Sequence, residues 1–380
     1  SMIQKALRIR YRILFFLYAI TLFAFLIFSY VFVDYNLLYL KIFYTGFSTL
    51  NREITTFIYI AFIFVLFVFY FLFLSLVKQK KLNMNHLRQL IGISLVALFF
   101  SYPAMLSYDI FNYTTTAKVL FSYHENPYII MPIEFIGDPS LLYTRAANKI
   151  ALYGPIWIVS NGIPYLLGFG NFLIALFNFK LFVSLFYIGC SYMIWKISKN
   201  ILSVSIFALN PLILVETLVS GHNDVAMMFL AIFSFFLLIH KRIALALLFL
   251  GFSILIKYAT LFLVPVFVYV VIKTVRKKQI NWEKVFSTSA IFMGIIFLLS
   301  VFREEIYPWY AIWFLIFTSI IPNKKIILYV SLAFSFGLLL RYIPAMYTGS
   351  YSGYTPFIKK LVTFLPPLIT GFAYAIKKKF

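Results

Sequence analysis

The chain has 380 residues, of which 63% are hydrophobic and 12% are charged. Soluble domains carry about 25% charged residues, so this composition excludes an ordinary soluble protein and indicates an integral membrane protein. The formal net charge of +22 does not indicate nucleic acid binding, because the basic residues form short clusters between apolar segments, as the positive-inside rule expects; membrane lipids, and not nucleic acid, are the expected partners.

Apolar runs of about twenty residues recur along the chain, and each is long enough to cross about 30 Å of hydrocarbon. They predict an all-α membrane protein with a single domain, residues 1–380, and about twelve spans. The predicted spans lie at about 13–33, 54–77, 88–106, 172–195, 202–219, 224–240, 242–256, 258–274, 284–302, 308–321, 326–346 and 361–376. Basic clusters precede the first span and follow the last, so both termini are expected in the cytoplasm of a multi-pass cell-membrane protein.

Two segments between the third and fourth spans depart from this pattern. Residues 107–155 are too polar to cross a membrane, and short helices on the outer surface are expected there. Residues 156–170 are apolar but short, and glycine and proline interrupt them. If this segment crossed the membrane, every later basic cluster would lie outside, against the positive-inside rule. We therefore predict an interfacial or re-entrant segment. Irregular backbone at membrane depth is tolerated where protein covers it.

Acidic residues gather at the predicted outer ends of the spans, with Glu283 as the one exception. The positive-inside rule does not require this, because it concerns Lys and Arg, so an outward-facing polar site is expected. Ionisable groups at membrane depth are costly and indicate function by default. Lys180 lies within the fourth predicted span, and the sequence offers it no partner.

Four motifs stand out between residues 108 and 224. They are Tyr108-Asp109-Ile-Phe-Asn112-Tyr113, Asn126-Pro127-Tyr128, Tyr153-Gly154-Pro155-x-Trp157, and Asn210-Pro211 followed by Glu216 and His222-Asn223-Asp224. They resemble the polyprenyl-phosphate-mannose-dependent mannosyltransferases of the GT-C superfamily, over about residues 88–240. In most such enzymes the acidic loop follows the first span, whereas here it follows the third.

The resemblance implies a GT-C-like bundle, a polyprenyl-phosphate-hexose donor, an outward-facing site and an inverting transfer. The residues fit that chemistry. An acceptor hydroxyl must lose its proton as it attacks the anomeric carbon, and Asp109 is the candidate general base. Fixed cations stabilise a leaving lipid phosphate, and the candidates are Lys257, Arg303 and Arg341. The residues expected to bind substrate are Asn112, Tyr113, Glu216, His222, Asn223, Asp224 and Tyr307.

Other roles remain open for some of these residues. Asp109 can cap a surface helix, and Asn223 with Asp224 can begin the sixth span. His222 and Asp224 are metal-ligand types, but no second histidine lies at helical spacing, so no metal and no cofactor are expected.

The alternative functions are a transporter or flippase of lipid-linked sugar, or a polymerase or ligase of lipid-linked oligosaccharides. A transporter needs access from both sides, and the predicted inner side has almost no acidic residues. The sequence therefore predicts a membrane hexosyltransferase, with mannose as the expected sugar and a glycolipid or glycan as the acceptor on the outer face.

Overall fold

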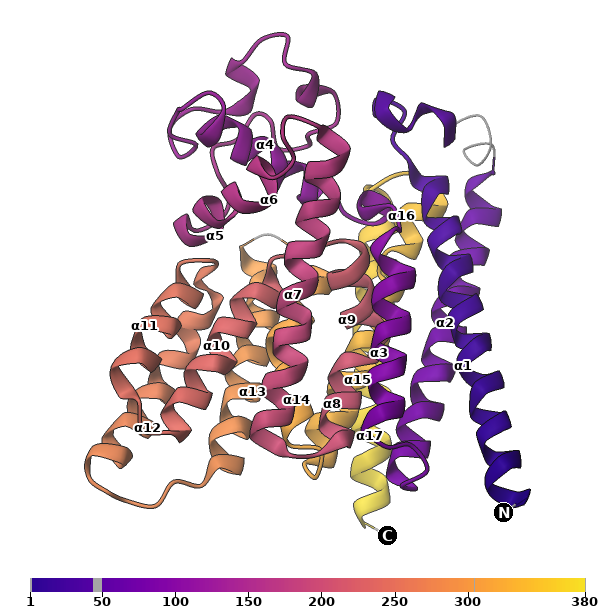
Figure 1. Ribbon diagram of the computed structural model, residues 1–380, viewed down its shortest axis with the longest axis vertical. Coiled ribbons are helices and arrows are strands. Elements are labelled where there is room, and N and C mark those ends of the chain that lie inside the picture. Colours follow the sequence, from indigo (N-terminus) through magenta and orange to yellow (C-terminus); the bar gives the residue numbers. More distant parts are fainter. Residues whose placement is uncertain (1, 44–49, 304, 380) are drawn as a thin grey trace.

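The computed structural model describes residues 2–43, 50–303 and 305–379, and these residues form helices and loops without a strand (Figure 1). This confirms the all-α prediction. The α-helices are α1 Met2–Ser29, α2 Arg52–Lys78, α3 Met84–Phe99, α4 Asp109–Phe121, α5 Pro155–Ser160, α6 Gly162–Leu166, α7 Phe172–Ser198, α8 Ile201–Ala208, α9 Pro211–Ile213, α10 Asp224–Ile239, α11 Ile243–Ile254, α12 Val264–Val275, α13 Trp282–Leu299, α14 Ile312–Ile320, α15 Lys325–Leu340, α16 Ile343–Thr348 and α17 Thr355–Lys379. A π-helix, η6, covers Leu214–Val219, and the 3-10 turns are η1 Tyr30–Phe32, η2 Leu38–Phe43, η3 Pro103–Met105, η4 Pro132–Glu134, η5 Pro139–Leu142, η7 Tyr258–Leu263, η8 Ser300–Phe302 and η9 Pro308–Ala311.

Six helical stretches of the described chain are long and apolar enough to cross a membrane. They are Tyr11–Phe32, Arg52–Lys78, Phe172–Ser198, Tyr258–Val275, Trp282–Phe302 and Lys325–Thr348. A pair bent by 51°, Ile201–Ala208 with Pro211–Val219, supplies a seventh if it counts as one span. Three further apolar helices are shorter, at Asp224–Ile239, Ile243–Ile254 and Pro308–Ile320. The protein therefore has six to seven candidate membrane spans, and the count of twelve stays a prediction.

Asparagine begins many of these helices. Its side-chain oxygen accepts a hydrogen bond from the second or third backbone N–H of the helix, which otherwise has no partner. The capping residues are Asn51, Asn83, Asn171, Asn200, Asn210 and Asn281. These caps stabilise the starts of six helices.

The predicted span at 202–219 is one of the elements that the structure changes, because it is broken at Asn210-Pro211. Proline lacks the N–H that a helix interior needs, so α8 ends and the chain restarts as α9 and the π-helix η6. The hydroxyls of Tyr70 and Tyr187 donate to the carbonyls of Ile206 and Ala208, at 2.8 and 2.6 Å. These bonds satisfy carbonyls beside the break, as buried irregular backbone requires. π-helical turns occur frequently at functional sites.

The polar segment between α3 and α7 lies at one end of the bundle. Figure 1 shows α4, α5 and α6 with their loops above the long helices, and both chain termini at the opposite end. Within this segment, the backbone N–H groups of Gly154 and Ile156 donate to the carbonyls of Ile256 and Leu255, at 3.0 and 3.1 Å. A Cβ atom at Gly154 would lie 2.0 Å from the Leu255 carbonyl oxygen, so glycine is needed for this close approach.

Candidate active site

Asp109 is the first residue of α4, and its carboxylate does not cap the helix. The hydroxyl of Ser107 accepts a hydrogen bond from the Asp109 backbone N–H at 3.3 Å, and no side-chain cap bond is made by Tyr108, the residue before the helix. The Asp109 side chain is 24% exposed. The carboxylate is thus held at a helix start while remaining accessible to another molecule.

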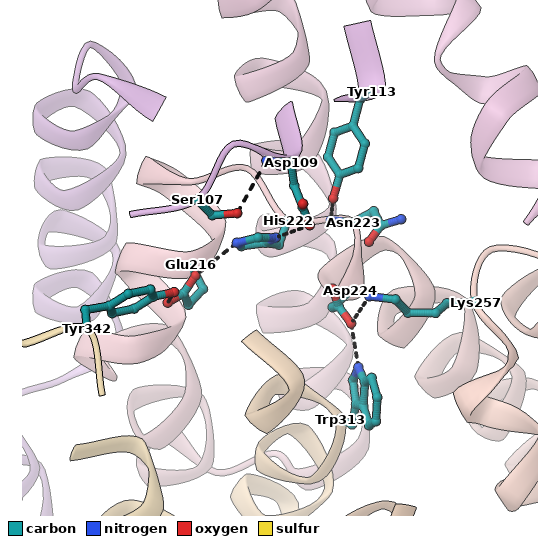
Figure 2. A network of polar contacts seen from close by, with 10 residues as sticks. All are labelled: Ser107, Asp109, Tyr113, Glu216, His222, Asn223, Asp224, Lys257, Trp313 and Tyr342. Carbon is teal, nitrogen blue, oxygen red and sulfur yellow. Dashed lines mark hydrogen bonds and ion pairs between the residues drawn. The ribbon is translucent and has the colours of Figure 1, made fainter. Parts of the chain in front are cut away.

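His222 joins Asp109 to the π-helix. It lies in the turn between η6 and α10, where Gly221 has a φ of +70°, and its side chain is fully buried. Its Nδ1 is 3.4 Å from Asp109 Oδ2 and its Nε2 is 3.2 Å from Glu216 Oε2 (Figure 2). The hydroxyl of Tyr342 donates to Glu216 Oε1 at 2.8 Å. We call Asp109, His222 and Glu216 the acidic triad.

The triad favours a charged imidazole. Burial by itself lowers the pKa of His222, but the carboxylates of Asp109 and Glu216 outweigh this effect and raise the pKa to about 9. An opposite charge at this range favours the ionised form. At neutral pH the His222 ring is therefore an imidazolium between two carboxylates, which keeps the Asp109 carboxylate oriented.

The opposite side of the same turn holds a second, fully satisfied carboxylate. Lys257 Nζ donates to both oxygens of Asp224 at 3.0 Å, and Trp313 Nε1 donates to Oδ1 at 2.6 Å. Asp224 is completely buried at the start of α10, where the helix dipole favours a negative charge. Lys257 also lies 4.7 Å from the Tyr310 ring centroid. We call Asp224, Lys257 and Trp313 the clamp (Figure 2).

The remaining motif residues differ in what they face. The hydroxyl of Tyr113 accepts a hydrogen bond from the Asn223 backbone N–H at 3.2 Å, which ties α4 to the turn of His222. Asn112 points to the loop after α4, where its side-chain oxygen accepts a hydrogen bond from Ala146 N at 3.3 Å. The amide group of Asn223 is buried, and within the described residues it has no hydrogen-bond partner.

A cavity of about 890 Å³ lies beside this site. Ser107 and Tyr108, which precede Asp109, line it. A stack of three rings connects it to the triad, because Trp309 stacks on His222 at 3.8 Å and on Tyr307 at 4.6 Å between centroids. Tyr307, Trp309 and Tyr342 belong to its wall.

Four cationic side chains line the cavity, at Arg52, Arg145, Arg341 and Lys359, together with the Glu305 carboxylate. Arg341 donates to Glu305 at 2.8 Å, and Lys359 pairs with the same carboxylate. Arg145 lies over the Tyr108 ring at 4.4 Å. The apolar part of the wall comprises Val31, Phe32, Leu50, Met105, Leu106, Ile306, Ala345 and Met346.

Comparison with known families assigns the chain. The family described as alpha-(1->6)-mannopyranosyltransferase, N-terminal domain, matches residues 29–273, well over half of the chain. The chain belongs to this mannosyltransferase family. The assignment confirms the resemblance to GT-C mannosyltransferases. No curated protein and no solved structure matches the chain. The matched part of the mannosyltransferase contains the whole triad and two residues of the clamp, Asp224 and Lys257. Trp313 of the clamp and Arg341 of the cavity lie beyond it.

The structure brings together only part of the set that the sequence predicts for the mannosyltransferase. Tyr307 and Arg341 line the cavity, whereas Arg303 is exposed and is not one of the lining residues. Lys257 pairs with Asp224 and does not line the cavity either.

Sequence reasoning did not assign Arg52, Arg145, Tyr342 and Lys359 to the site of the mannosyltransferase. Arg145 had one usable signal, because it is the only arginine in the polar segment 107–155. Among the described residues, no group of three or more His, Cys, Asp or Glu side chains is arranged to hold a metal ion, and the expectation of a metal-free site stays a prediction.

Proposed function

We propose that this mannosyltransferase moves mannose from a polyprenyl-phosphate donor to a hydroxyl of a glycolipid or glycan acceptor, with inversion at the anomeric carbon. The observation that carries the proposal is the setting of Asp109. Its carboxylate is partly exposed, is paired with the buried His222 and follows two residues that line the large cationic cavity. This is the arrangement of a general base held by an orienting partner.

The proposed reaction is a single displacement. The acceptor oxygen forms a bond to the anomeric carbon while its proton passes to the Asp109 carboxylate, and the bond from that carbon to the phosphate oxygen breaks. The polyprenyl phosphate leaves with the electron pair. His222 stays protonated and orients Asp109, and Glu216 holds the other nitrogen of the imidazole. A positioned base of this kind contributes about 10²–10⁴-fold to the rate.

The cavity suits the proposed donor in both halves. Negative charge grows on the leaving phosphate, and fixed cations stabilise it. Arg341 and Lys359 share the single Glu305 carboxylate, so these three side chains together keep an excess of positive charge. The planar guanidinium of Arg341 can bind a phosphate through two hydrogen bonds. The apolar wall around Phe32 and Leu106 fits the first isoprene units, and the rings of Tyr307 and Trp309 fit the sugar.

We further propose that the shorter apolar helices complete a bundle of about twelve spans. Basic residues cluster near both termini, and the segment 107–155 lies at the other end of the bundle (Figure 1). Under the positive-inside rule, this supports our proposal of cytoplasmic termini and a site at the outer face. The short helices α4, α5 and α6 would then lie on that face.

The test is transfer of radiolabelled mannose from polyprenyl-phosphate mannose in liposomes, with the Asp109→Asn variant beside the wild type. We expect transfer by the wild type and a loss of about 10²–10⁴-fold in the variant. Glu125→Gln is the matched control, because Glu125 is an exposed carboxylate of the same polar segment and should leave transfer unchanged. Equal transfer by Asp109→Asn would remove Asp109 as the base. A wild type that moves the intact donor across the bilayer without transferring its sugar would favour the flippase.

A further inference from the structure

Lys180 is a charged residue that belongs neither to the triad, nor to the clamp, nor to the cavity wall. It lies within the long helix α7 and is fully buried. A charged group at this depth is costly unless it is fully hydrogen-bonded. Its Nζ donates to the carbonyl oxygens of Leu98 and Ser101, at 2.9 and 2.6 Å, and to the Ser101 hydroxyl at 3.0 Å.

These three contacts account for every N–H of an ammonium group. The Ser101 hydroxyl gives its own hydrogen to the Leu98 carbonyl at 2.5 Å, so it can only accept from Lys180. All three partners of Nζ are therefore acceptors, which matches the three N–H donors of a lysine ammonium. Backbone and hydroxyl oxygen atoms hold the Lys180 nitrogen on three sides.

The acceptors lie at a particular place in the chain, the C-terminus of α3. The last carbonyls of a helix have no partner within it and carry the negative end of the helix dipole. α3 ends at Phe99, so the Leu98 carbonyl lies in its last turn, where it also accepts from the Ser101 backbone N–H at 3.1 Å. Ser101 follows the helix, and its carbonyl is the second backbone acceptor of Lys180. Lys180 thus supplies hydrogen-bond donors to oxygen atoms at the end of α3, and these oxygen atoms satisfy its buried Nζ.

The segment that Lys180 holds leads to the base. Residues 100–108, which we call the link, connect α3 to Asp109, and Ser101 lies near the beginning of the link. The next residue, Tyr102, donates its backbone N–H to the Ser29 hydroxyl at 2.8 Å. Close to the other end, Ser107 accepts from the Asp109 N–H. The link is therefore anchored at its start by Lys180 of α7 and Ser29 of α1, and at its end Ser107 bonds to the backbone of Asp109.

We propose that Lys180 is a positioning residue for the transfer reaction. The three hydrogen bonds of its Nζ fix the end of α3 and the start of the link, and through the link they set the position of the Asp109 carboxylate against the cavity. The inference rests on the proposed role of Asp109. A displacement of about 1 Å in such a group costs up to about 10²-fold in rate, so a contact far from the chemistry can matter.

The experiment compares Lys180→Met with the wild type, in liposomes with polyprenyl-phosphate mannose and by backbone hydrogen exchange. Methionine is unbranched and one atom shorter than lysine, so it keeps most of the side-chain volume and removes all three donors. We expect kcat to fall about 10–100-fold, with the donor KM within about threefold. We also expect faster exchange over residues 99–109 and unchanged exchange in α10 to α14. Ser94→Ala is the matched control, because Ser94 is buried in α3 and bonds to Tyr18, and it should change neither kcat nor exchange in the link.

The two measurements, transfer rate and hydrogen exchange, separate the role of Lys180 from the proposed transfer function. Exchange in the link does not need turnover, so a wild type without transfer would refute the proposed function and still allow the anchoring to be tested. Unchanged exchange and kcat in Lys180→Met would overturn the inference, as would faster exchange throughout the bundle with kcat lost and KM raised together. If Lys180→Met does not fold, Ser101→Ala, which removes one of the three acceptors, gives the same test with a smaller expected effect.

Discussion

The triad and the clamp lie on either side of one turn, and they treat their carboxylates in opposite ways. In the clamp, Asp224 is completely buried and accepts three hydrogen bonds from Lys257 and Trp313. In the triad, Asp109 is partly exposed, and its side-chain partner is one nitrogen of His222 at 3.4 Å. A buried carboxylate with both oxygen atoms hydrogen-bonded stabilises structure, whereas a partly exposed one with an oxygen atom open to another molecule can take a proton. The comparison predicts catalysis on one side of the turn and stability on the other.

The largest effect that separates the two sides is expected from the pair Asp109→Asn and Asp224→Asn. Losing the Asp224 charge leaves the Lys257 ammonium without its carboxylate, and breaking a buried pair in this way costs about 3–5 kcal/mol. We expect the free energy of unfolding of Asp224→Asn to fall by roughly that amount. Asp109→Asn should lower it by less, because His222 keeps Glu216 as a partner. Denaturant unfolding in detergent measures both. An equal loss of stability in the two variants would break the comparison.

Removing both charged residues of the clamp makes the comparison sharper. In Asp224→Asn with Lys257→Met, no charge remains unpaired, and such a replacement of a buried ion pair is often close to neutral. We expect the double variant to recover at least about 2 kcal/mol of the stability lost in Asp224→Asn, as a double-mutant cycle measures. Its transfer rate should stay within about tenfold of the wild type. If the rate falls as far as in Asp109→Asn, Lys257 acts on the substrate after all.

The cationic cavity provides a smaller effect with a matched control. Arg341 lines the cavity and Arg303 does not, although the sequence makes both candidates for binding the lipid phosphate. A hydrogen bond to a charged group contributes about 1.5–3 kcal/mol, so Arg341→Gln should raise the donor KM at least about tenfold. Arg303→Gln should leave it within about twofold. Initial rates at varied donor concentration measure both KM values. A larger rise in Arg303→Gln than in Arg341→Gln would place the phosphate site near Arg303.

The pH dependence of stability tests the charge of the triad. The pKa of His222 is raised from 6.5 to about 9, so the folded protein binds its proton more tightly than the unfolded chain does. The resulting stabilisation is fully present below about pH 6.5 and is lost as the pH rises through about 9. We expect the melting temperature of the wild type to fall over this window more steeply than that of His222→Asn. Parallel curves would mean that the imidazole is neutral in the folded state.

The smallest expected effect comes from Tyr113→Phe. The hydroxyl of Tyr113 accepts one hydrogen bond from the Asn223 N–H, and a bond of this kind contributes about 1 kcal/mol. We expect a loss of roughly that size in the free energy of unfolding and a fall of a few-fold in kcat. A loss as large as in Asp109→Asn, measured in the same transfer assay, would make Tyr113 a participant in the chemistry.

Several features of this protein could be predicted from the sequence because they are local. Composition and run length predict membrane helices, and the six to seven candidate spans agree with that class. Asn171 caps α7 one residue before the predicted start of its span, and Asn210-Pro211 lies where the next span breaks. The His222-Asn223-Asp224 motif is also read directly from neighbouring residues, and the family match bears out the resemblance it carries.

What the tertiary structure decides is which of these residues meet. Arg341 and Arg303 have the same charge and similar predicted depth. Arg341 lines the cavity because α15, which it follows, packs against α17 and η9, whereas Arg303 does not line it. The sequence cannot name the partners of Lys180, because two of its three acceptors are backbone carbonyls, which every residue carries. Composition and periodicity therefore determined the class and the motif, and the folded bundle alone determined the contacts, since these depend on long-range packing between helices far apart in the chain.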